Sequence, residues 1–137
     1  MKKLLLIAVC CLILCGCSNK DTTRYSTFCS SSSNELINQG SILRTTIYHD
    51  KTSYTSYLED NSYLFNTIDE AINVEKELID DCNNTKNEYV DCIVKRNEDW
   101  IYVTTSVKCN NDLDCSYEKL INNYKEKNME CIQDTLK

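Results

Sequence analysis

The chain has 137 residues, with 15 Lys or Arg against 21 Asp or Glu, so its formal net charge is −6. Apolar residues make up 42%, which excludes a disordered chain, and the acidic balance disfavours binding to nucleic acid. The length suits one small domain. Ten cysteines in so short a chain indicate an oxidising compartment, a metal cluster or both.

The first residues have the pattern of an export signal. Lys2 and Lys3 precede the apolar run Leu4 to Leu14, which is too short to span a bilayer but suits a secretory signal. The run ends in Leu14-Cys15-Gly16-Cys17 and is followed by polar residues. This motif resembles the lipobox of bacterial lipoproteins, although Cys15 stands where Ala, Ser or Thr is usual.

The lipobox resemblance implies that Cys17 carries a thioether-linked diacylglycerol and becomes the mature N-terminus. Residues 1–16 are then the lipoprotein signal peptide, 17–24 are the lipidated Cys and a tether, and 25–137 are a single extracytoplasmic domain. Two acyl chains anchor a protein stably. We therefore expect the chain on the extracytoplasmic side of a bacterial cell membrane.

Cleavage also changes the cysteine count and the charge. Loss of Lys2 and Lys3 from the 15 basic residues leaves 13 against 21 acidic ones, a net charge of −8. Six cysteines remain besides Cys17, and an even number in an exported domain predicts three disulfides with fifteen possible pairings. They are Cys29, Cys82, Cys92, Cys109, Cys115 and Cys131.

The first half of the domain favours strands. Tyr25 to Ser30 is a short β-prone segment, and the polar residues that follow indicate a loop. Ser41 to His49 is rich in β-branched residues, with Leu43, Thr45 and Ile47 on one face. Asp50-Lys51-Thr52 predicts a turn, after which Ser53 to Leu64 returns as the second strand of a hairpin.

The period then changes to that of a helix between Thr67 and Cys82. Thr67 and Glu70 have the spacing of a capping box. The residues on the buried side of the predicted helix recur three or four apart: Ile68, Ala71, Ile72, Glu75, Leu78, Ile79 and Cys82.

Two more strands and a second helix complete the chain. Alternation predicts strands over Tyr89 to Lys95 and Trp100 to Lys108, with a turn at 96–99 between them. After a loop at 110–114, Asp114 or Ser116 can cap a last helix that runs to about Met129. This order of elements predicts an α+β fold: an antiparallel β-sheet with two α-helices packed on one face (order β-β-β-α-β-β-α), stapled by disulfides.

The order of elements behind a lipobox, with Thr27-Phe28-Cys29 and Met129-Glu130-Cys131 near the two ends, resembles the small YehR-like lipoproteins. This bacterial family has no assigned function. The resemblance implies a Cys29–Cys131 bridge. Cys109 and Cys115 then close a local loop, and Cys82 is left for Cys92.

No chemical motif emerges from the residues. The mature chain has no closely spaced pair of Cys or His that a zinc site or redox dithiol needs. The single histidine, His49, is expected to be solvated beside its turn. Asp112 and Asp114 are weak calcium ligands, since a helix cap explains Asp114 more simply. We expect no catalytic residue, metal or cofactor, and an envelope hydrolase is the least favoured reading.

The sheet face opposite the helices carries the candidate binding residues, Tyr48, Tyr57, Trp100 and Tyr102. Exposed Tyr and Trp can stack on sugars or grip a protein partner, although cross-strand pairing also explains them. The sequence thus predicts a lipid-anchored, non-enzymatic binding or structural module of the cell envelope. The alternative is an adaptor or inhibitor subunit that docks on another envelope protein, and a cell-wall partner also stays open.

Overall fold

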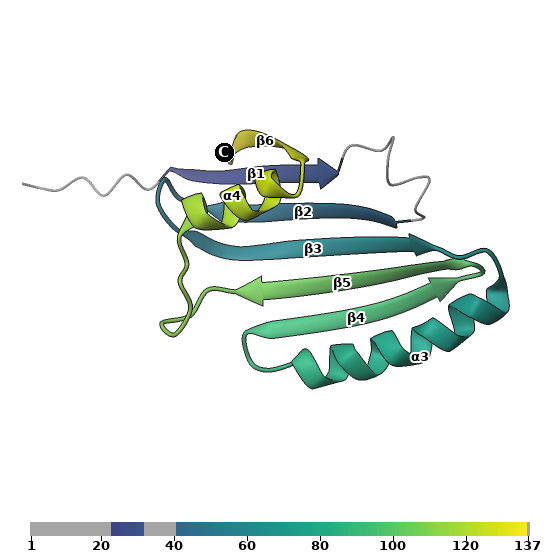
Figure 1. Ribbon diagram of the computed structural model, residues 1–137. Coiled ribbons are helices and arrows are strands. Elements are labelled where there is room, and N and C mark those ends of the chain that lie inside the picture. The colour runs from purple at the N-terminus through teal and green to yellow at the C-terminus, as the bar shows by residue number, and fades with distance from the viewer. Residues whose placement is uncertain (1–22, 32–40, 137) are drawn as a thin grey trace, which may run out of the picture.

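The computed structural model describes residues 23–31 and 41–136. They form a six-stranded antiparallel sheet in the order β4-β5-β3-β2-β1-β6, together with two helices (Figure 1). The predicted lipid attachment site Cys17, the predicted signal peptide, most of the predicted tether and residues 32–40 lie outside the described residues. The predicted fold class, an antiparallel sheet with two helices and three disulfides, is confirmed.

The first three strands are β1 (Arg24–Ser31), β2 (Ser41–His49) and β3 (Tyr54–Leu64). β2 and β3 form the predicted hairpin, and β1 pairs with the other side of β2. The turn is held by Asp50, whose Oδ1 accepts hydrogen bonds from the backbone N–H groups of Thr52 (2.7 Å) and Ser53 (2.8 Å). This is the role that a short carboxylate has in a turn.

The helix α3 (Ile68–Thr85) begins at its predicted cap, because the Thr67 hydroxyl accepts a hydrogen bond from the Glu70 backbone N–H at 3.2 Å. Along α3, Ala71 and Cys82 are buried, whereas Ile68 and Ile79 are exposed. The helix therefore covers the sheet with only part of its apolar stripe, and it lies alongside β4 (Figure 1).

The second hairpin comprises β4 (Val90–Asn97) and β5 (Trp100–Lys108), the latter with the predicted bounds. β5 also pairs with β3, so it joins the second hairpin to the first. Glu98 turns the chain with a positive φ of 56°. The structure places this turn between Asn97 and Trp100, so the turn starts two residues later than the sequence predicts.

The last part of the chain differs from the prediction. The helix α4 (Tyr117–Glu126) is capped by Ser116, but it ends before Met129, and β6 (Met129–Leu136) follows as a sixth strand. β6 pairs with β1 over its whole length. Asn128, with a φ of 58°, reverses the chain between helix and strand. Asn tolerates this left-handed conformation, which ends helices.

Both helices lie on one face of the sheet, as predicted. The strand register aligns one row of residues on that face across all six strands: Cys131, Cys29, Thr45, Glu59, Thr105 and Cys92. Cys92 is bonded to α3 through Cys82, and Glu59 accepts a hydrogen bond from Tyr124 of α4. We call this the inner face. Its core beneath α4 contains Cys29, Ile47, Tyr54, Ile121, Tyr124 and Met129.

Three disulfides join the six cysteines in the pairs that the resemblance implied. Cys29–Cys131 joins directly paired residues of β1 and β6, and its partners are 102 residues apart in sequence. Cys82–Cys92 joins α3 to β4. Cys109–Cys115 closes the short loop that leads from β5 to α4. The bridges therefore join β6 to β1, the helix α3 to the edge strand β4, and the two ends of the loop before α4.

Candidate functional site

The face of the sheet opposite the two helices, here called the outer face, carries no described helix. A row of side chains crosses it along paired positions, from Ile132 on β6 through Phe28 and Thr46 to Leu58 on β3. Ile132 is 73% exposed and Phe28 is 44% exposed. Large apolar side chains left in contact with water on one surface are typical of a binding surface. We call these four residues the outer row.

Charged side chains of both signs flank the outer row. On one side Arg44 is paired with Asp60, and Glu130 lies opposite Ser30 at the sheet edge. On the other side Lys108 and Asp134 occupy the corresponding positions of β5 and β6. Asp60 also accepts a hydrogen bond from the Thr104 hydroxyl at 2.6 Å. An apolar centre with a polar rim of mixed charge is the usual anatomy of a protein interface.

Three of the four predicted aromatic residues lie on the outer face, but they do not form one patch. Trp100 and Tyr102 stack with ring centroids 6.2 Å apart on β5. Tyr102 pairs with Ser62, whereas Tyr48 pairs with Ser56, six residues away along β3. Six residues of strand span roughly 20 Å. Tyr48 therefore lies at the opposite end of the face from the Trp100–Tyr102 pair.

The prediction for Tyr57 is wrong, because its side chain lies on the inner face. Tyr57 pairs with Ile47 and packs against the core beneath α4, with its ring at the edge of Tyr54 (5.5 Å between centroids). A shift of one residue in register moves a side chain to the other face. The sequence of the hairpin alone does not determine the register in which β2 and β3 pair.

The sequence reading missed the centre of the outer face. Phe28 alternates with Thr27 and Cys29, both of which are buried, so alternation around Cys29 already placed Phe28 outside. Ile132 lies on β6, which the sequence does not predict, because the predicted helix runs to about Met129 and no element follows it. Ile132 lies two residues from both Glu130 and Asp134, on the same face of β6. This alternation is the one local sequence signal for its position.

His49 is buried, not solvated as expected, with 3% exposure. Its ring stacks on Tyr117 (centroids 3.6 Å apart) and lies 5.6 Å from the Tyr25 ring. Nδ1 is 2.5 Å from the Asp50 carbonyl oxygen, so Nδ1 carries a proton and donates it. Nε2 lies 2.8 Å from the Thr27 hydroxyl. Both ring nitrogens are thus engaged, and the ring joins β2 to β1 through Thr27 and to α4 through the stack on Tyr117.

A cavity of about 540 Å³ opens at the end of the sheet where β1 begins and β6 ends. Its walls include Arg24 and Leu136, which are directly paired, and Tyr48, Thr55 and Ser56 of the hairpin. His49 and Asp50 complete one side. The volume falls in the usual range for sites that bind small molecules.

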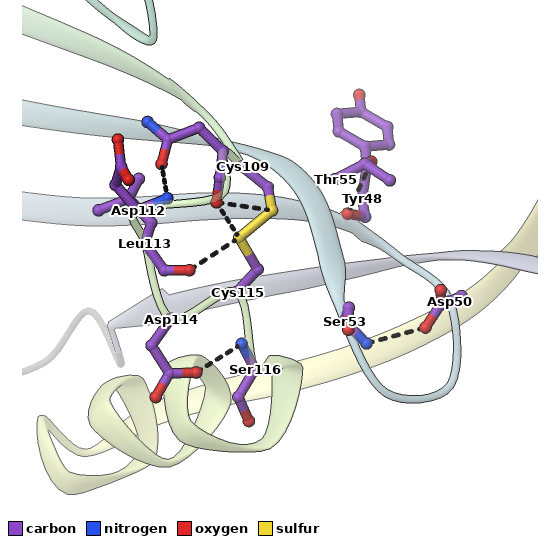
Figure 2. Close-up of a disulfide and its surroundings, with 11 residues drawn as sticks. Tyr48, Asp50, Ser53, Thr55, Cys109, Asp112, Leu113, Asp114, Cys115 and Ser116 are labelled. Carbon is purple, nitrogen blue, oxygen red and sulfur yellow. Dashed lines mark hydrogen bonds between the residues drawn. A yellow bond between two sulfur atoms is a disulfide. The ribbon is translucent and has the colours of Figure 1, made fainter.

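The loop closed by Cys109–Cys115 is fastened beside this end of the hairpin (Figure 2). The backbone N–H of Tyr54 donates to the Cys115 carbonyl, and that of Cys109 donates to the Thr55 carbonyl, both at 2.9 Å. On the hairpin, the Thr55 hydroxyl donates to the Tyr48 carbonyl at 3.1 Å (Figure 2). These bonds fix the backbone of Tyr48 and Thr55 at the cavity wall.

The pKa shifts of Tyr124, in the core, and Asp50, in the exposed hairpin turn, have different causes. Burial, together with the nearby Glu59 carboxylate, raises the pKa of Tyr124, whose hydroxyl donates to Glu59 Oε2 at 2.7 Å. At the hairpin, hydrogen bonds from the Ser53 and Thr52 backbone lower the pKa of Asp50. Tyr124 thus stays neutral beneath α4, while Asp50 stays charged beside the cavity.

The weak calcium reading of Asp112 and Asp114 gains no support from their contacts. Asp114 Oδ1 accepts a hydrogen bond from the Ser116 backbone N–H at 3.1 Å, and Oδ2 pairs with Lys119. Ser116, not Asp114, caps α4. Across residues 23–31 and 41–136, no three His, Cys, Asp or Glu side chains are grouped so that they could hold a metal ion.

Neither of the two described helices has the length and apolar character needed to cross a membrane. The chain was compared with protein-family models, with curated proteins and with solved structures, and none of the three comparisons finds a match.

Proposed function

We propose that the chain is a lipid-anchored module of the bacterial cell envelope that binds another envelope protein through its outer face. The lipobox ending at Cys17 supports the anchor, and six cysteines paired in three disulfides suit an oxidising, extracytoplasmic compartment. We include in this proposal that the chain is related to the YehR-like lipoproteins.

The observation that carries the binding role is the outer row. Helices cover the inner face, whereas Ile132 and Phe28 stay exposed on a sheet whose edge strand β6 is itself part of the surface. A row of three large apolar side chains and Thr46, between charges of both signs, fits a folded protein better than a glycan, because sugars need polar partners around a stacking ring. This favours the adaptor role over attachment to the cell wall.

Site-specific cross-linking in intact cells tests the proposal. A photoreactive phenylalanine analogue at position 28 is expected to give one discrete adduct with an envelope protein. The same analogue at position 68 is the matched control, since Ile68 is exposed on α3, away from the outer face. Phe28→Ser combined with Ile132→Ser should abolish co-purification of the adducted partner while the melting temperature stays within a few degrees of wild type.

The anchor is tested in the same cells. The wild-type chain should fractionate with membranes, and Cys17→Ser should lose both membrane association and the adduct. A Cys17→Ser chain that remains with membranes overturns the anchor. Equal adducts from positions 28 and 68, or none from position 28, overturn the outer face as the docking surface. An adduct between two copies of this chain assigns that surface to self-association instead.

A further inference from the structure

The cavity at the end of the sheet is a second feature, separate from the outer row. Its charged donor is Arg24, which forms no ion pair with any residue that the structure describes. A guanidinium presents five N–H donors in a planar fork that matches the oxygens of a phosphate. The Arg24 guanidinium is therefore available to an anion, because no described carboxylate forms an ion pair with it.

The other ionisable groups of the wall are already engaged. Asp50 Oδ1 accepts hydrogen bonds from the Thr52 and Ser53 backbone and from the Thr52 hydroxyl, so this carboxylate is held by its own turn. Both nitrogens of His49 are hydrogen-bonded, to Thr27 and to the Asp50 carbonyl. Arg24 is thus the charged group that remains to select a ligand.

The rest of the wall is suited to a polyol. Tyr48 and Ser56 carry hydroxyl groups, and they line the cavity together with Tyr25 and Leu136. Neighbouring hydroxyl and aromatic groups bind the alternating polar and apolar surface of glycerol or a sugar. The backbone of this wall is fixed by the Thr55–Tyr48 hydrogen bond and by the stapled loop (Figure 2).

The cavity also lies near the point where the chain reaches the membrane. Thr23, on its wall, is six residues from Cys17, and six residues span at most about 20 Å. This step depends on the proposed lipid anchor, whereas the chemistry of the wall does not. With Cys17 in the membrane, the cavity is held within reach of the headgroup layer.

We propose that the cavity binds a glycerophosphate group, with its phosphate on the Arg24 guanidinium and its polyol against Tyr48 and Ser56. The group is carried either by a membrane phospholipid or by a soluble polyol phosphate. The mature chain has a net charge of −8, so general attraction to anions does not supply the affinity. The local contact with Arg24 must provide it.

Calorimetry on the full acylated chain in neutral detergent, with glycerol 3-phosphate as the probe, tests the cavity. Wild type should bind one equivalent. Arg24→Gln should weaken binding by about tenfold or more, the effect of losing a hydrogen bond to a charged group. Arg24→Lys keeps the charge without the fork and should fall between the two. Arg44→Gln is the matched control, since Arg44 is exposed on the outer face but does not line the cavity.

A second measurement identifies the source of the phosphate. The acylated chain is placed in nanodiscs of phosphatidylcholine with or without phosphatidylglycerol, and hydrogen exchange is followed in residues 23–31 and 46–56. Slower exchange with phosphatidylglycerol in wild type, but not in Arg24→Gln, assigns the site to a lipid headgroup. Slower exchange only with added glycerol 3-phosphate assigns it to a soluble ligand.

Absence of binding to both probes, or equal binding by wild type and Arg24→Gln, overturns the proposal. Equal loss in Arg44→Gln also overturns it, because the effect would then reflect total charge. Failure of the anchor is seen separately, in the fractionation of Cys17→Ser. In that case the glycerol 3-phosphate titration still decides whether the cavity binds its ligand.

Discussion

Thr27 places its hydroxyl between two aromatic side chains, 2.8 Å from His49 Nε2 and 2.8 Å from Tyr117 Oη, and the residue is 1% exposed. His49 Nδ1 donates to the Asp50 carbonyl, so the Thr27 hydroxyl is the partner of the other ring nitrogen, Nε2. The same hydroxyl is also hydrogen-bonded to the Tyr117 hydroxyl. One hydroxyl therefore satisfies polar groups of β2 and α4 in a place without access to water.

Thr27→Val keeps the shape of the side chain but removes this hydroxyl, so His49 Nε2 is left buried without its hydrogen-bond partner. We expect the free energy of unfolding to fall by about 1–3 kcal/mol, the cost of an unsatisfied buried polar group. Urea unfolding followed by circular dichroism measures it. Thr46→Val, on the outer face of β2, is the control and should be nearly neutral. Equal stability of Thr27→Val and wild type would show that the network contributes nothing.

The positions of two side chains, His49 and Tyr57, could not be predicted from the sequence. His49 ends a strand beside a polar turn, a pattern typical of exposure. Yet α4, which lies far later in the sequence, covers it with Tyr117. Tyr57 depends on the register of the hairpin, including its irregularity between Tyr48 and His49. Both placements are set by contacts distant in sequence. Alternation within one strand cannot predict them.

At the scale of elements, the junction between α4 and β6 controls the far edge of the sheet. Asn128 takes a φ of 58°, and the Lys127 and Asn128 backbone N–H groups donate to the Tyr124 and Lys125 carbonyls in the last helical turn. The reversal brings Met129 into the core and sets Cys131 opposite Cys29. The start of β6 therefore depends on one left-handed residue.

Asn128→Val should destabilise the chain by about 1–2 kcal/mol, because a side chain with a branched Cβ clashes with the backbone at positive φ. Asn128→Gly should cost nothing measurable at this position, since Gly adopts positive φ without a clash. Asn123→Val on the exposed surface of α4 is the control, as Asn and Val have similar helix propensities. Denaturant midpoints compare the three. Equal midpoints for the valine variants at 128 and 123 would contradict a special role for the junction.

The elements that could be predicted are those with a local signal. Trp100 to Lys108 alternates along its whole length, and Thr67 with Glu70 marks the start of α3, so both matched the structure. β6 was missed because Met129 continues the spacing of Tyr117 and Ile121 well enough to extend a helix. The stop signal was Asn128, which is less distinctive than the glycine usual at helix ends.

For the molecule as a whole, the disulfides act on a sheet assembled from distant parts of the chain. β1 and β6 lie side by side at one edge (Figure 1), and Cys29–Cys131 joins them across 102 residues. The sequence predicted the count of bridges, and the resemblance implied their pairing. Neither of them predicted that Cys29–Cys131 joins two neighbouring strands, because the sixth strand, β6, was not predicted.

The cost of removing each bridge should follow the length of chain that it closes. A cross-link restricts the unfolded chain more as its loop grows, by about 4.7 kcal/mol for roughly 100 residues and about 3 kcal/mol for roughly 15. Double Cys→Ala variants should therefore lose most stability at Cys29–Cys131, less at Cys82–Cys92 (10 apart) and least at Cys109–Cys115 (6 apart). Urea unfolding of the oxidised proteins gives the order. With reductant added, wild type should fall below every oxidised variant, because all three bridges are then open. A largest loss at the six-residue loop would contradict this account.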